Sequence, residues 1–142
     1  MALCCPARRG PAGPAGPPGP PGPALRYLVA GEPIPQGERV IYVDHQGFAY
    51  LSDGVEAHTI SIVGVTTGIA VPLGGQVPYL PVNGVIEPLS GMLGWYGDCW
   101  AGLGGQIVRY QDLPMGVFSR RIGTSVPPRA LFLDFGIVVE KT

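Results

Sequence analysis

Few residues of this chain combine a type and a spacing that could support catalysis. Neither of its two histidines, His45 and His58, belongs to a motif with a plausible nucleophile. Asp44-His45 and Asp98-Cys99 could hold a metal ion, but neither pair belongs to a C-x-x-C or H-x-x-x-H pattern. Ordinary turn chemistry explains these pairs better, so we predict no enzyme, no metal site and no cofactor.

The glycine-rich stretch from Leu89 to Gly105 could suggest a phosphate loop. However, no Gly-Lys-Ser/Thr follows it, and no helix is expected there whose N-terminus could receive a phosphate. We interpret its glycines as tight turns.

Aromatic residues in or beside glycine-rich turns are a different kind of candidate. Such side chains anchor interfaces or stack on sugar rings, although the tryptophans could equally fill the core. An apolar strand expected at Leu25 to Ala30 could also pair with a partner strand. The candidate interface residues are Leu25, Tyr27, Leu28, Tyr79, Trp95, Tyr96 and Trp100, with Tyr110 in a similar setting.

A strict triplet pattern, GPA-GPA-GPP-GPP-GPA, runs from Gly10 to Ala24. Proline holds each strand extended, and only glycine fits at the axis where three strands meet, so this period is typical of a collagen triple helix. The tract therefore predicts a homotrimer. The trimerisation glycines are Gly10, Gly13, Gly16, Gly19 and Gly22.

The same tract has a simpler interpretation as a semi-rigid Pro/Gly linker. A linker would tolerate irregular glycine spacing, whereas no triplet here is broken. A triple helix of this length would span about 45 Å, at about 3.1 Å per residue, and is too short to hold three chains together alone. We therefore expect a stalk on a domain that supplies most of the association. Cys4 and Cys5, just upstream, could form interchain disulfides or remain reduced thiols.

The composition narrows the possible partners. Charged residues make up 13% of the 142 residues and the net charge is −1, which argues against nucleic acid. No window approaches the roughly 20 apolar residues that span a membrane, and the first residues lack the apolar core of a signal peptide. The three cysteines form no spaced framework. We expect no membrane partner, and synthesis in a reducing cytoplasm.

The chain divides into a head at residues 1–9, the collagen-like tract at 10–24 and an all-β domain at 25–142. This domain is expected to be a small, turn-rich barrel or sandwich of eight to ten short strands, without a confident helix. A hairpin is predicted at 39–51, with its turn at 44–47, and a second one around Asn83-Gly84. Further strands are expected at 25–30, 58–65, 106–111 and 130–140, and a turn at Gly74-Gly75.

A faint internal repeat supports a barrel built from two similar units. Tyr42-Val-Asp44 is matched by Tyr96-Gly-Asp98, each following a glycine turn. Each is followed by an apolar-Gly-x-Thr/Ser bend, which contains Gly64 in the first case and Gly123 in the second.

Four segments carry a resemblance to known proteins: AGEPIPQGERVIYVDHQGFAYLSD, IVGVTT, LGGQVPYLPVNGVIE and RIGTSVPPRALFLDFG. Together they cover roughly residues 30–138 and resemble capsid decoration (cement) and head-fibre proteins of tailed phages. The resemblance implies a small β domain, often trimeric, that sits on the outer shell of a virion and clamps neighbouring capsid subunits. The chain departs from that pattern by its collagen-like tract, where a simple N-terminal arm would be expected.

The leading hypothesis is a homotrimeric decoration protein, made in the host cytoplasm and located on the outer capsid surface. It would bind the major capsid protein at three-fold or quasi-three-fold positions. The alternative is a fibre or receptor-binding head whose aromatic residues contact a host glycan. A decoration protein would be present in dozens to hundreds of copies per particle and a fibre tip in few, so copy number separates the two hypotheses.

Overall fold

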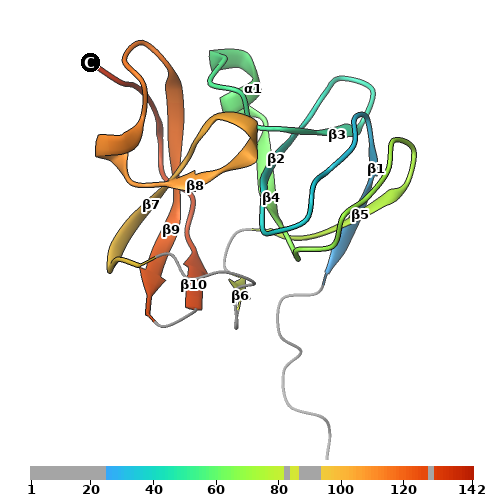
Figure 1. The fold of residues 1–142 in the computed structure, drawn as a ribbon. Coiled ribbons are helices and arrows are strands. Elements are labelled where there is room, and N and C mark those ends of the chain that lie inside the picture. The colour runs from blue at the N-terminus through green and yellow to red at the C-terminus, as the bar shows by residue number, and fades with distance from the viewer. Residues whose placement is uncertain (1–24, 82–83, 87–93, 128–129) are drawn as a thin grey trace, which may run out of the picture.

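The computed structural model describes residues 25–81, 84–86, 94–127 and 130–142 (Figure 1). The triplet glycines, Cys4, Cys5 and Asn83 lie outside the described residues. Within the described part the fold is all-β, as expected. Its elements are β1 (Arg26–Ala30), β2 (Val40–Val43), β3 (Phe48–Leu51), α1 (Glu56–Ile60), β4 (Ile62–Thr66), β5 (Gln76–Leu80), β6 (Val85–Ile86), β7 (Gly97–Ala101), β8 (Ile107–Val108), β9 (Phe118–Val126), β10 (Ala130–Leu133) and β11 (Val138–Glu140), with 3-10 turns at Leu103–Gly105 and Tyr110–Asp112.

The first half of the chain forms a closed barrel with the strand order β1-β3-β2-β4-β5. β1 closes it, because β1 pairs antiparallel with β5 along Arg26 to Val29 and parallel with β3 at Val29 and Ala30. The β2–β3 hairpin is confirmed. The Asp44 carboxylate holds its turn by accepting hydrogen bonds from the backbone N–H groups of Gln46 (3.0 Å) and Phe48 (2.8 Å).

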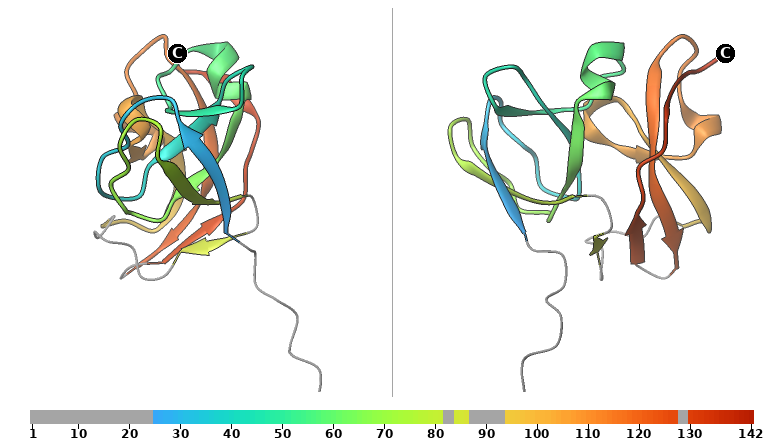
Figure 2. Two further views of the ribbon diagram at one scale, coloured as in Figure 1. Left: turned by 90° about the vertical axis from the view of Figure 1, so that its right-hand side faces the viewer. Right: turned by 180° about the vertical axis from the view of Figure 1, so that it is seen from behind.

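The second half forms a sheet with the order β6-β10-β9-β7-β8, to which β11 adds by pairing with the start of β9. The barrel and this sheet lie side by side, and α1 lies above the contact between them (Figure 1). Two further views show the same arrangement (Figure 2).

The two halves repeat one topology. The order β3-β2-β4-β5-β1 in the first unit corresponds to β8-β7-β9-β10-β6 in the second. The registers fix the residue equivalences: Gly64 of β4 lies opposite Ile41, and Gly123 of β9 lies opposite Cys99. The internal repeat predicted from sequence is therefore present, and its match of Gly64 with Gly123 is confirmed, but its match of Tyr42 with Tyr96 was wrong by four residues. Trp100, not Tyr96, is the structural equivalent of Tyr42.

Two hydrophobic clusters form the core. One fills the barrel, and the other joins the two units; β2 contributes to both, with Ile41 in the barrel and Val40 and Tyr42 in the shared cluster. Its alternating side chains therefore connect the two units. The barrel cluster is Ala30, Ile34, Ile41, Ala49, Val71, Val77 and Tyr79, and the shared cluster is Val40, Tyr42, Ile62, Val65, Ile86, Cys99, Ala101, Ile122, Leu131 and Leu133.

The strand expected at 58–65 is instead the helix α1 followed by β4. The Asp53 carboxylate accepts a hydrogen bond from the Val55 N–H (3.2 Å), and the Thr59 hydroxyl donates back to the Val55 carbonyl (2.9 Å). The Asp53 bond forms a turn that leads into the helix, and the backbone bond from the Thr59 N–H to the Val55 carbonyl (2.8 Å) closes its first turn. The apparent two-residue alternation is misleading, because Ile60 is 60% exposed whereas Ile62 is 5% exposed.

Two other expected strands are shorter than predicted. Within 106–111, only Ile107–Val108 is extended, and Tyr110–Asp112 forms a 3-10 turn. The run at 130–140 divides into β10 and β11, because the Asp134 and Gly136 N–H groups bond to the carbonyls of Ile122 and Arg121 between the two strands. As a result, the described residues contain eleven strands rather than eight to ten.

The hairpin predicted around Asn83-Gly84 is also wrong. β5 pairs with β1 and β4, whereas β6 pairs with β10. The segment between them connects the two units, and the Gly84 carbonyl accepts a hydrogen bond from the Leu133 N–H (2.8 Å). The turn at Gly74-Gly75 is confirmed by the positive φ of Gly74 (83°) and by the bond from the Gly75 N–H to the Pro72 carbonyl (2.9 Å).

Candidate functional site

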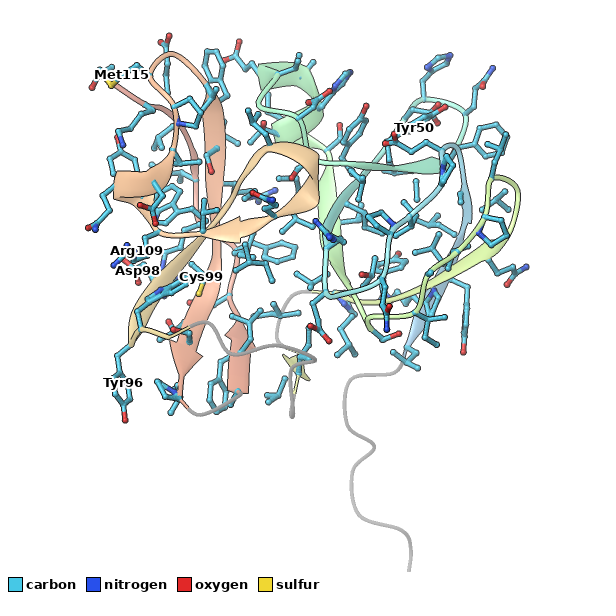
Figure 3. All side chains as sticks on the ribbon, in the orientation of Figure 1. Tyr50, Tyr96, Asp98, Cys99, Arg109 and Met115 are labelled. Carbon is cyan, nitrogen blue, oxygen red and sulfur yellow. The ribbon has the colours of Figure 1, made fainter. Side chains whose placement is uncertain are left out.

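An open pocket of about 620 Å³ lies against the second sheet, where β7, the 3-10 turn at Tyr110–Asp112 and β11 come together. This volume falls in the range of about 300–1,000 Å³ that is usual for small-molecule sites. Figure 3 shows Asp98 and Arg109 close together at this edge of the molecule, with Tyr96 projecting below them. The pocket is lined by Trp95, Tyr96, Trp100 and Tyr110, by Asp98, Arg109 and Gln111, and by Val139.

Strand alternation in β7 decides which side chains reach the pocket. Cys99 and Ala101 are 0% and 4% exposed and belong to the shared core. Asp98 and Trp100 therefore point to the opposite face. Burial also raises the pKa of the Cys99 thiol, which lowers its reactivity.

The turn after β8 brings the second pair of aromatic residues together. Trp100 lies opposite Val108 in the β7–β8 pair, and the chain then enters the 3-10 turn at Tyr110. The rings of Trp100 and Tyr110 meet edge to face, with centroids 5.1 Å apart. The Lys141 ammonium lies 4.5 Å from the Tyr110 ring centroid and donates a hydrogen bond to the Tyr110 carbonyl (2.7 Å). The end of the described chain thus supports this wall of the pocket.

Arg109 is held from two sides. Its guanidinium lies 5.8 Å from the Trp95 ring centroid, and its Nε donates a hydrogen bond to Asp112 Oδ2 (3.0 Å). Both partners of this ion pair are about half exposed, so the pair adds little to stability. Together with the contact to the Trp95 ring, the pair favours one direction of the guanidinium beside the pocket.

Asp98 is positioned by a second network. Arg121 Nε donates to Asp98 Oδ1 (2.9 Å), while the two Nη groups donate to the Asp134 carbonyl (3.0 Å) and to Thr124 Oγ1 (2.7 Å). The hydrogen bond with Asp98 raises the pKa of Arg121 above its ordinary value. Arg121 contacts one of the two Asp98 carboxylate oxygens, so the other is available as an acceptor.

The structure brings together three of the residues singled out from sequence, Trp95, Tyr96 and Trp100, and adds Tyr110 to them. Tyr79 does not join them. It is 7% exposed and packs inside the barrel, so the interface role expected for it is wrong. The sequence of β5 could have shown that Tyr79 is a core residue. Side chains alternate along a strand, so Tyr79 lies on the same face as the buried Val77.

The three apolar candidates at the start of the domain lie on the other unit. Leu25 and Tyr27 are exposed (45% and 57%), whereas Leu28 is half-buried and packs against the barrel core. The expected addition of a partner strand to β1 is blocked at Val29 and Ala30, because β3 already pairs there. Sequence reasoning missed Arg109, Gln111 and Val139, and it considered Asp98 only beside Cys99 as a metal pair; the approach of these residues to the aromatic side chains depends on strand register.

A second cluster of titratable residues lies at α1. His58 Nδ1 is 2.8 Å from Asp53 Oδ2, and the imidazole stacks on Tyr42 with centroids 4.3 Å apart. An Asp–His pair orients an imidazole, but catalysis also requires a nucleophile in reach. Among the described residues, no group of three or more acidic, histidine or cysteine side chains could hold a metal ion. The ring contact between His58 and Tyr42 indicates that the His58–Asp53 pair serves to hold α1 in place.

The buried phenol of Tyr42 predicts that the folded state loses stability at alkaline pH. Burial, with smaller effects of Asp53 and Glu32, raises its pKa from 10.0 to about 12. The folded state thus favours the neutral phenol, so its contribution to stability is complete below pH 10 and is lost as the pH rises toward about 12. We expect the urea midpoint to fall over this interval, and to fall less in Tyr42→Phe. An equal loss in both proteins would assign the effect to other groups.

Comparisons with protein-family models, curated proteins and solved structures found no match. Within the described residues, no helix is long and apolar enough to cross a membrane.

Proposed function

We propose that this chain is a homotrimeric structural protein of a virion. It binds the major capsid protein on the outer shell at three-fold or quasi-three-fold positions and stabilises the shell. The observation that carries the proposal is an exposed apolar face on β1, directly after the collagen-like tract.

This face, here called the β1 face, consists of Leu25, Tyr27, Val29 and Phe48. Tyr27 and Val29 are two residues apart, so they point to the same side of β1, and they are 57% and 37% exposed. Phe48 of β3 lies opposite Val29 and is 36% exposed. β1 lies on the side of the barrel away from the second sheet (Figures 1 and 2). The β1 face therefore lies outside both core clusters and is available to a partner.

The position of the β1 face in the chain favours another copy as that partner. The triplets end at Ala24 and β1 begins at Arg26, so a triple helix would bring three β1 strands close to one axis. Burying the part of these side chains that is still exposed would contribute about 25 cal/mol per Å² of apolar surface. A closed three-fold assembly buries the same patch on every copy. Tract and domain then favour the same trimer.

A trimer suits a decoration protein because each of its subunits can contact an equivalent capsid subunit. Three modest contacts in one rigid body reinforce each other by effective concentration. Since the contacts exist only on the assembled shell, binding shifts the equilibrium toward the assembled state.

Substitutions in the β1 face and in the collagen-like tract should show which of the two holds the trimer together. Tyr27→Asp places a charge in the proposed contact and is expected to shift the mass in light scattering from trimer toward single chains. Met115→Asp, at a 70% exposed position on the other unit, is the control and should remain trimeric. Gly16→Val should disturb the tract but leave the trimer of the domain intact. If Gly16→Val dissociates the trimer and Tyr27→Asp does not, the tract is the organiser.

The function itself is tested by counting copies of the chain in purified virus particles, using quantitative mass spectrometry against the major capsid protein. We expect dozens to hundreds of copies per particle, with loss of the chain lowering the temperature at which particles release their genome. A few copies per particle would instead indicate a fibre tip, and absence from the particle would contradict a virion role.

A further inference from the structure

We propose that the pocket on the second sheet binds a neutral saccharide. This inference is independent of the virion role and does not require a trimer. The pocket lies at the opposite side of the molecule from the β1 face (Figures 1 and 3), so the proposed trimer contact does not cover it.

The first argument is the combination of aromatic and polar lining. A sugar ring presents an apolar C–H face and a rim of hydroxyl groups, so its site needs an aromatic surface next to hydrogen-bonding side chains. Tyr96 is 75% exposed and offers an open ring. Trp95 and Trp100 are half-buried and form the walls, and Trp95 also packs against the shared cluster. Together these rings form a contiguous aromatic patch, and such exposed patches mark ligand or partner sites.

The second argument is the fixed geometry of the polar groups. Arg109 uses Nε on Asp112, which leaves both Nη groups as donors beside the Trp95 ring. Asp98 uses one carboxylate oxygen on Arg121, which leaves the other as an acceptor. Hydroxyl groups both donate and accept, so a sugar rim can satisfy both side chains at once. The ion pairs bias both side chains toward these positions, which reduces the conformational entropy that is lost on binding.

The third argument concerns charge and selects neutral ligands. Three cations lie in or beside the pocket, Arg109, Arg121 and Lys141. Three carboxylates balance them, with Asp112 paired to Arg109 and both Asp98 and Asp134 paired to Arg121. An anionic ligand, such as a phosphate or an acidic sugar, would meet the carboxylate of Asp98 as well as the guanidinium of Arg109. The site therefore favours uncharged hexose or N-acetylhexosamine rings.

The two tryptophans of the chain, Trp95 and Trp100, both line this pocket, so intrinsic tryptophan fluorescence reports on it directly. The full chain would be titrated with neutral oligosaccharides of glucose, galactose, mannose and N-acetylglucosamine. At least one of them is expected to change the emission with a saturable curve. A sialylated oligosaccharide, titrated in parallel, should bind more weakly.

Two pocket variants and one control make the test specific. Tyr96→Ala and Arg109→Gln should each weaken binding about tenfold, as is usual for an anchoring side chain in a binding site. Phe132→Ala removes a 44% exposed aromatic ring that does not line the pocket, and it should bind like the unaltered chain. Circular dichroism checks that each variant is folded. The proposal is overturned if no neutral oligosaccharide changes the emission, if both pocket variants bind as tightly as the unaltered chain, or if the sialylated probe binds best.

Discussion

Gly123→Ala is expected to lower the free energy of unfolding by about 3 kcal/mol, at the upper end of the usual cost of overpacking. A Cβ at this position would overlap the carbonyl oxygen of Phe132 in β10. The overlapping atom is backbone, so no side chain can turn away to make room. β9 and β10 would have to separate where Gly123 lies opposite Leu133.

The matching position in the barrel gives a second measurement of the same effect. A Cβ at Gly64 would overlap the carbonyl oxygen of Leu80. Gly47→Ala is the control, because its φ is 88° and no atom lies within 4 Å of the added carbon. That variant should lose only the cost of a left-handed alanine, about 1 kcal/mol. Urea unfolding followed by circular dichroism measures all three, and equal losses would show that strand approach does not constrain the two bends.

Ile122→Ala is the other substitution with a large expected effect, about 3 kcal/mol of lost unfolding free energy. Ile122 is 0% exposed and belongs to the shared cluster, together with Val40 and Val65 of the barrel. Truncating it leaves a cavity where the two units meet. The barrel and the second sheet should therefore lose stability together and unfold in one transition.

Ile137→Ala is the matched control, since the same side chain is removed at a 78% exposed position. Its expected effect is within about 0.5 kcal/mol. Tryptophan fluorescence follows the second unit, and hydrogen exchange at the amides of β2 and β5 follows the barrel. If Ile122→Ala accelerates exchange in the second sheet but not in the barrel, the two units are independent and the shared cluster does not couple them.

The features predicted correctly from sequence are those that depend only on residues close together in the chain. The β2–β3 hairpin was predictable because Asp44 and Gly47 define its turn within four residues. The apolar-Gly-x-Thr/Ser bends at Gly64 and Gly123 also occur within single strands. Closure of the barrel was not predictable, because it depends on a parallel contact between Val29 and Phe48, which lie far apart in the chain.

The same contrast between local and long-range features applies to the candidate site. Aromatic residues in a glycine-rich stretch identified Trp95, Tyr96 and Trp100 as candidates. Their arrangement with Arg109 depends on the pairing of Trp100 with Val108, which no local pattern specifies. The helix α1 was missed for a related reason: the turn at Asp53 and the backbone bond from the Thr59 N–H to the Val55 carbonyl outweigh the weak alternation of a short segment.

The mass of this 142-residue chain in solution tests most directly the central claim, that three copies of it associate. Light scattering on the eluting peak of a size-exclusion column gives this mass independently of shape. We expect three times the 14.8 kDa of the single chain, at all concentrations down to the micromolar range. A peak with the mass of one chain across the same range would contradict the trimer and, with it, the proposed three-fold binding to a capsid shell.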